Sequence, residues 1–222
     1  MSQSESHDVV ENNWNVPNAL TTLRIVMVPF FGWALLHDGG ESTTWRWVAY
    51  ALFVIAMITD KVDGDIARKH NLITNFGKIA DPIADKAMTG MAFIGLAVIH
   101  DFMPAWVWWT IAVVVLVREW AVTFARLSIA KDVVMPAKQS GKVKTVMQVV
   151  ALGGFIAPFG HFTGAFDVVG DALWWASAIA MAIAVVLTIT SGVEFARDVV
   201  RHRRGTPATA PGPSSHGSSG QA

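Results

Sequence analysis

The hydrophobic residues of this chain gather in six long segments that are separated by polar stretches. The segments run over Leu20–Leu36, Trp45–Thr59, Ala87–Ile99, Met103–Phe124, Val146–Phe159 and Ala172–Val193. A helix needs about 20 residues to cross a bilayer, so the second, third and fifth segments are too short by their apolar residues alone. They reach that length if their helices continue through polar neighbours, forward to about Arg68, back to about Lys78 and back to about Gly141. The pattern predicts an all-α integral membrane protein with six transmembrane helices.

The polar extensions and the basic residues together predict how the chain sits in the membrane. With alternating helices, the three extensions fall on one side, where they must face protein or a water-filled cavity instead of lipid. Sixteen of the seventeen Lys and Arg residues lie on that same side, and only Arg46 lies opposite. This bias indicates that the side is cytoplasmic and that both termini are there. We therefore expect a multi-pass protein of the cell membrane with a polar cavity open to the cytoplasm.

Composition supports lipid as the solvent and divides the chain into three parts. Charged residues make up 15% of the chain, against about 25% in soluble domains, and the mean hydropathy is +0.43. The formal net charge of zero gives no reason to expect a nucleic acid partner, and the absence of cysteine excludes disulfides. Residues 1–19 are polar and net acidic, so we expect no cleavable signal peptide, and residues 1–14 form a polar N-terminal segment. We assign residues 15–204 to the six-helix domain and expect residues 205–222, rich in Gly, Pro, Ser and Ala, to form a disordered tail.

Between the second apolar segment and the third, four aspartates fall into two closely spaced pairs. Asp60 and Asp63 are three residues apart, and Asp81 and Asp85 are four apart, so each pair lies on one face of its helix. Because a short link joins the two helix ends, all four carboxylates can point toward one another. Carboxylates this close repel each other in a low dielectric and require cations or protonation, and their hard oxygens suit Mg²⁺ or Mn²⁺.

The residues that follow Asp60 on the same helical stripe suit a phosphate ligand. Gly64 and Ala67 leave room for a bulky group against the helix, and Arg68 can contact a phosphate with two nitrogens. Carboxylates, metal, space and a guanidinium together describe a pyrophosphate site. The plainer alternative is that the aspartates only mark or cap polar helix ends. Four ionisable side chains in register at the membrane surface favour the functional interpretation.

The spacing of these residues is that of a known signature. The pattern Asp60-x2-Asp63-Gly64-x2-Ala67-Arg68-x8-Gly77-x3-Asp81-x3-Asp85 resembles the complete signature of the CDP-alcohol phosphatidyltransferase family. Members of that family have six transmembrane helices, use divalent metal and usually form homodimers. The resemblance implies that Asp60, Asp63 and Asp81 hold a pair of Mg²⁺ or Mn²⁺ ions, with Asp85 also close enough to be a ligand and acting as the general base. The implied CDP-binding residues are Asn18, Thr21, Asp60, Asp63, Gly64, Ala67, Arg68 and Gly77.

Three further stretches, Asn15–Arg24, Phe76–Lys86 and Arg118–Thr145, resemble the branch of the family whose acceptor is glycerol-3-phosphate. The implied reaction transfers the phosphatidyl group of CDP-diacylglycerol to glycerol-3-phosphate and yields phosphatidylglycerophosphate and CMP. Four cations near one cavity mouth suit a phosphate dianion, so the candidate acceptor-binding residues are Arg118, Arg126, Lys142 and Lys144.

Each of these assignments has a plainer explanation. Lys142 and Lys144 can reflect positive-inside topology alone, and Glu119 can simply neutralise Arg118. Asn15, Asn18 and Thr21 are residue types that cap helices, so they can serve only the first helix, whereas the resemblance places Asn18, Thr21 and Arg24 near the nucleotide.

Two other functions remain open from the sequence. Inositol phosphate could replace glycerol-3-phosphate as the acceptor in the same chemistry. A cation transporter could instead use the aspartate cluster as its ion site, but transport needs a polar path through both leaflets, and the outer halves of these helices are almost purely apolar. A silent scaffold would have no need for Asp85.

Overall fold

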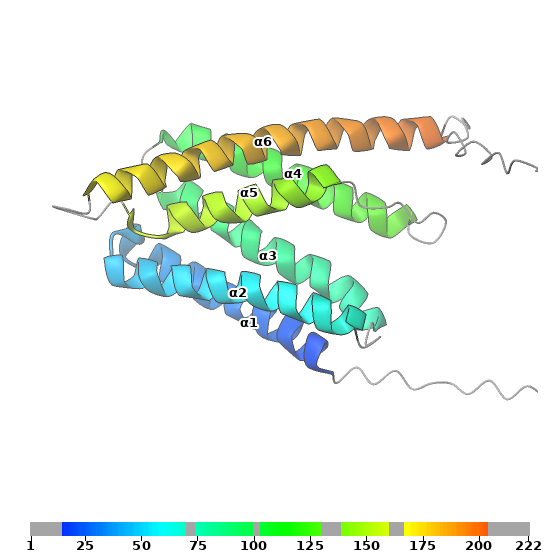
Figure 1. Cartoon of the computed structure of the whole chain (residues 1–222), viewed down its shortest axis with the longest axis horizontal. Coiled ribbons are helices and arrows are strands. Elements are labelled where there is room, and N and C mark those ends of the chain that lie inside the picture. Colours follow the sequence, from blue (N-terminus) through cyan, green and yellow to red (C-terminus); the bar gives the residue numbers. More distant parts are fainter. Residues whose placement is uncertain (1–14, 70–73, 100–102, 130–138, 160–166, 204–222) are drawn as a thin grey trace, which may run out of the picture.

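The computed structural model describes residues 15–69, 74–99, 103–129, 139–159 and 167–203, and all regular structure in these ranges is helical. The long helices are α1 (Val16–Leu36), α2 (Thr43–Lys69), α3 (Asn75–Ile99), α4 (Ala105–Ile129), α5 (Gln139–Ile156) and α6 (Asp167–Arg203), with a short 3₁₀ helix, η1 (His37–Gly40), between α1 and α2. Consecutive long helices run in opposite directions along the long axis of the bundle (Figure 1). The predicted all-α class and the polar extensions of α2, α3 and α5 are confirmed.

Four helices are long and apolar enough to cross a membrane by themselves. These candidate spans are Val16–Gly40, Ala80–Ile99, Ala105–Ala125 and Asp167–Arg197. Within the described residues α2 does not qualify, and α5 contributes only a shorter apolar stretch, Val143–Ile156. Both helices carry the polar extensions discussed above, which lower their mean hydropathy. Four helices therefore identify the chain as a membrane protein. That all six long helices cross the membrane stays a prediction.

Much of the outer surface of the bundle is apolar. Large hydrophobic side chains on several helices are more than half exposed, among them Phe30, Ile58, Val117, Trp175 and Val186. Apolar surface of this extent is unusual on a soluble monomer, and it suits contact with lipid chains.

Small residues allow α1 and α3 to pack closely. A Cβ added at Gly32 would lie 2.9 Å from the Sδ atom of Met91, and one added at Gly95 would lie 2.5 Å from Cδ2 of Leu35. Glycine at helix contacts lets backbones approach within a membrane, where packing contributes more to association than apolar burial does. This contact fixes the position of α3 against α1, and the other ends of both helices carry the polar residues described below.

Arg46, the one basic residue on the opposite side of the predicted membrane, has a structural explanation. Its guanidinium is buried and donates to the carbonyl oxygens of Phe155 (2.6 Å) and Ile156 (3.0 Å) at the end of α5, and to that of Gly40 (3.4 Å). The last carbonyl groups of a helix lack partners within the helix, so Arg46 satisfies those of α5 and joins it to η1 and α2.

Candidate active site

The start of α1 is hydrogen-bonded to the start of α3 and to the residue before it. Asn15 caps α1 by accepting a hydrogen bond from the backbone N–H of Asn18 (2.9 Å), as the capping alternative predicted. The side chain of Asn18 reaches across to Thr74, whose hydroxyl lies 3.0 Å from its Nδ2 atom and 3.1 Å from its Oδ1 atom. Thr21 donates to Oδ1 of Asp81 at 2.5 Å. Asn18 and Thr21 therefore connect α1 directly to the segment that carries Asp81.

Gly77 permits this contact between α1 and α3. Thr74 precedes α3 and accepts a hydrogen bond from the N–H of Gly77 (3.0 Å), which is the geometry of a helix N-cap. A Cβ at Gly77 would come within 3.1 Å of Oδ1 of Asn18 and 3.8 Å of Oδ2 of Asp81. The glycine thus leaves room for two polar side chains close to the backbone.

Arg24 is buried and contacts two aspartates of α2, Asp60 and Asp63. Its Nη1 atom contacts Oδ1 of Asp60 at 2.6 Å, and its Nη2 atom contacts Oδ2 of Asp63 at 2.5 Å. The arginine side chain is fully buried, and Asp63 is nearly so, whereas the side chain of Asp60 is 39% exposed. The planar guanidinium can contact two carboxylates at once, and it supplies the positive charge that the buried Asp63 and its neighbour Asp60 require.

The structure brings the four signature aspartates into one region. Asp63 lies within electrostatic range of Asp81, and Asp85 lies within range of both Asp60 and Arg24. The helix ends therefore face each other as the spacing predicted. Among the described side chains, no three acidic or histidine groups converge closely enough to form a ready-made ion site. The donor set nevertheless fits Mg²⁺ or Mn²⁺, because carboxylate oxygens are the ligands that these ions share with substrate phosphates.

A second polar cluster forms around Glu119 of α4. Its Oε2 atom accepts from Nζ of Lys86 on α3 (2.8 Å), and its Oε1 atom accepts from Nη1 of Arg118 (2.8 Å) and from Nζ of Lys144 on α5. Nη2 of Arg118 donates to the hydroxyl of Ser191 on α6 at 2.7 Å. The predicted acceptor residues Arg118 and Lys144 are thus brought together, and the neutralising role considered for Glu119 is present.

Several predicted site residues cannot be placed. The side chains of Ala67, Arg68, Arg126 and Lys142 lie outside the described part of the structure. Conversely, sequence reasoning missed Thr74, Lys86, Glu119 and Ser191 as candidate site residues. For Lys86 and Glu119 a signal existed, since charged residues inside an apolar segment of a membrane protein are usually functional. No comparable signal marks Thr74 or Ser191.

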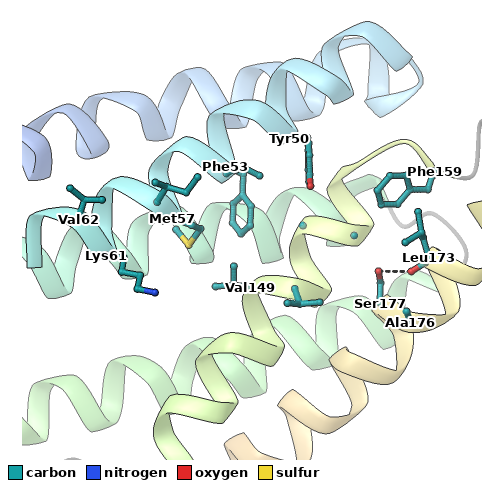
Figure 2. A pocket seen from close by; sticks show the side chains of 15 residues that line it. Tyr50, Phe53, Met57, Lys61, Val62, Val149, Phe159, Leu173, Ala176 and Ser177 are labelled. Carbon is teal, nitrogen blue, oxygen red and sulfur yellow. Dashed lines mark hydrogen bonds between the residues drawn. The ribbon is translucent and has the colours of Figure 1, made fainter. Parts of the chain in front are cut away.

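An apolar cavity of about 540 Å³ lies between α2, α5 and α6 (Figure 2). Its lining on α2 extends from Tyr50 to Lys61 and Val62, on either side of which stand Asp60 and Asp63. Phe159 and Ser177 line the opposite end of the cavity from Lys61 and Val62 (Figure 2). From Tyr50 to Val62 the helix rises about 18 Å, so the cavity follows α2 over this length and reaches the part of the helix that carries Asp60 and Asp63, which are not among its lining residues. Lys61 is its one charged lining residue, and an alkyl chain is the type of ligand that suits such a lining.

Comparison with known proteins decides the family. The model of the CDP-alcohol phosphatidyltransferase family matches residues 14–197. The chain belongs to this family. The match includes all four signature aspartates, Arg24 and the whole cluster around Glu119.

Curated members of the family are similar to the chain over most of its length. A protein of Mycobacterium tuberculosis named probable phosphatidylglycerophosphate synthase is 41% identical over 196 residues, which is 88% of this chain and 87% of that protein. The CDP-diacylglycerol–glycerol-3-phosphate 3-phosphatidyltransferase of Bacillus subtilis is 38% identical over 195 residues, or 82% of this chain and 93% of the relative. A Rickettsia felis protein of the same name is 37% identical over 186 residues, again 82% of this chain and 93% of the relative.

Proposed function

We propose that this chain transfers the phosphatidyl group of CDP-diacylglycerol to glycerol-3-phosphate, giving phosphatidylglycerophosphate and CMP. The observation that carries the proposal is the adjacency of two clusters on α3. Asp81 and Asp85 belong to the acidic cluster, and the next residue, Lys86, belongs to the cationic cluster around Glu119. A diphosphate donor with its metal suits the acidic cluster, and a phosphorylated acceptor suits the cationic one. The names of the similar proteins agree with this reaction.

In the proposed mechanism, the CDP portion binds along α1, α2 and the start of α3. Magnesium or manganese, as two ions held by Asp60, Asp63 and Asp81 with Asp85 beside them, would neutralise the pyrophosphate and make its β-phosphorus more electrophilic. The expected contacts to CDP come from Asn18, Thr21, Gly64, Ala67, Arg68 and Gly77 together with the aspartates. Arg24 keeps Asp60 and Asp63 aligned for this purpose.

Asp85 is the proposed general base. Its carboxylate takes the proton from the primary hydroxyl of glycerol-3-phosphate, and the hydroxyl oxygen forms a bond to the β-phosphorus. The bond from that phosphorus to the bridging oxygen breaks, and CMP leaves with this oxygen. The acceptor's phosphate is held by Arg118 and Lys144, together with Arg126 and Lys142.

Measuring CMP release tests the proposed reaction. We expect the purified protein with Mg²⁺ to release CMP from CDP-diacylglycerol when glycerol-3-phosphate is present, and to stop when EDTA is added. Inositol phosphate and a reaction without acceptor serve as comparisons. CMP release with inositol phosphate alone would contradict glycerol-3-phosphate as the acceptor but support the transfer reaction. Metal-dependent ion flux in liposomes without CMP release would favour a transporter.

The same assay tests sidedness in sealed vesicles. We propose that the site faces the cytoplasm and that both termini lie there, as the positive-inside bias supports. Added glycerol-3-phosphate should then support activity in inverted cell-membrane vesicles and not in right-side-out vesicles.

Assembly as a homodimer, expected from the family resemblance, is checked by measuring the mass of the purified particle in detergent.

We further place one acyl chain of CDP-diacylglycerol in the apolar cavity, because the cavity is apolar and reaches the part of α2 that carries Asp60 and Asp63. Replacing Ala176, which lines it, with tryptophan should raise the KM for long-chain CDP-diacylglycerol several-fold, by filling the space that the chain occupies. The KM for glycerol-3-phosphate should not change. Ala172→Trp is the matched control, since Ala172 is exposed one turn earlier on α6 and does not line the cavity. Equal effects of both substitutions would argue against this placement.

A further inference from the structure

The cluster around Glu119 carries more positive charge than its carboxylate neutralises. Three cationic side chains contact the one carboxylate, which leaves a formal charge of +2 in a place where these side chains are only 6–18% exposed. Excess charge in such a setting is unfavourable unless an anion joins it. Counting Asp85, which lies beside Lys86, the formal excess is +1. A phosphate monoester carries between about −1.5 and −2 at pH 7, so it is an anion that offsets this excess.

Glu119 orients the cations that surround it. Lys86, Arg118 and Lys144 come from three helices, and each directs one donor to this carboxylate. A lysine ammonium has three N–H groups, so one contact with Glu119 fixes its direction and leaves further donors for a ligand. Without the carboxylate, three like charges would repel one another and move apart.

Arg118 is held from its other side by α6. Its Nη2 atom donates to the hydroxyl of Ser191, whose own proton goes to backbone carbonyl oxygens of α6, those of Leu187 and Thr188. A Cβ at Gly192 would lie 3.2 Å from Cγ of Arg118, so the glycine leaves room for the aliphatic part of the arginine side chain. The Nε atom of Arg118 is buried and has no hydrogen-bond partner among the described residues. The guanidinium is thus fixed in direction without having all its donors satisfied.

The cluster is also close to the proposed general base. Asp85 lies within electrostatic range of both Lys86 and Glu119. An acceptor that places its hydroxyl at Asp85 therefore places a phosphate a few bonds away near these cations.

We propose that Glu119 is a positioning residue that aligns Lys86, Arg118 and Lys144 to receive the phosphate of the acceptor, with Ser191 as a second support. This inference rests on the proposed function and adds Lys86, Glu119 and Ser191 to the acceptor site. Glu119 acts through its neighbours and does not contact the reacting atoms.

The test is a comparison of KM values. Glu119→Gln keeps the size of the side chain and removes its charge, and we expect it to raise the KM for glycerol-3-phosphate about tenfold or more. The KM for CDP-diacylglycerol should stay within about twofold, and Glu119→Asp should restore part of the loss. Glu41→Gln, the same change at an exposed residue beside η1, should have no effect. An unchanged or lower KM for glycerol-3-phosphate would overturn the inference, as would an equal rise in both KM values.

Two further measurements keep the inference testable if Glu119→Gln does not fold or the wild type proves inactive. Ser191→Ala removes no charge and should raise the KM for glycerol-3-phosphate about threefold or more, because a hydrogen bond to a charged group is lost. Inorganic phosphate should raise the melting temperature of the wild type more than that of Glu119→Gln. An inactive wild type that still shows this difference would refute the proposed function alone. An active wild type without it would refute the positioning role alone.

Discussion

Asp85→Asn should reduce CMP release by about a hundred- to ten-thousandfold, because the amide cannot accept the proton of the attacking hydroxyl. The substitution preserves the size of the side chain on α3, so the contacts of Thr21 with Asp81 and of Lys86 with Glu119 should remain. The loss should therefore appear in kcat, with a smaller change in the KM for glycerol-3-phosphate. Initial rates at saturating concentrations of both substrates measure the effect.

The control for Asp85→Asn is the same change at an exposed site. Asp171 lies in the first turns of α6, away from the signature, and Asp171→Asn should leave kcat unchanged. Inhibition of the Asp85→Asn variant by CMP would show that its nucleotide site is intact. Residual activity within tenfold of the wild type would mean that another group takes the proton.

Arg24→Met should produce the largest loss of stability. Removing one partner from a buried ion pair leaves charge uncompensated and costs about 3–5 kcal/mol. We expect about 3 kcal/mol here, since Asp60 is partly exposed and water can solvate it. For a chain of this size the melting temperature should fall by about 10 °C, measured in detergent with EDTA present.

A conservative variant separates charge from geometry at Arg24. Arg24→Lys keeps the charge, but a single ammonium cannot contact Asp60 and Asp63 through two separate nitrogens. Its melting temperature should lie between those of the wild type and Arg24→Met, and its kcat/KM for CDP-diacylglycerol should still fall. Added Mg²⁺ should narrow the stability difference, because an ion supplies the missing charge. If Arg24→Met and the wild type have the same melting temperature in EDTA, the ion pair contributes nothing to the stability of the fold.

The sequence predicted the helices well and their membrane crossing less completely. The apolar segments and the length that a span requires were enough to extend α2 and α5 into polar sequence, and both extensions are present. The same polar residues keep these two helices from qualifying as spans by composition. The role of Arg46 was not predictable, because its partners are carbonyl groups about 110 residues away in the chain.

For the candidate site, residues close in sequence were easier to group than residues that meet through packing. The spacing of Asp60, Asp63, Asp81 and Asp85 was sufficient to place them together. Glu119 was considered only as a partner of Arg118, its neighbour in the chain. Its contacts with Lys86 and Lys144 depend on how α3 and α5 pack against α4, which local periodicity does not specify.

The close packing of α3 against α1 through Gly32 and Gly95 has a mechanical consequence. A single helix carries Asp81 on the nucleotide side and Lys86 on the acceptor side, only five residues apart, and a helix resists stretching over so short a length. Any tilt or rotation of α3 therefore displaces Asp81 and Lys86 together, and with them the nucleotide site and the acceptor site. A larger side chain at Gly95, near the other end of the helix, should therefore change the KM values of both substrates. It should not change the KM of one substrate alone.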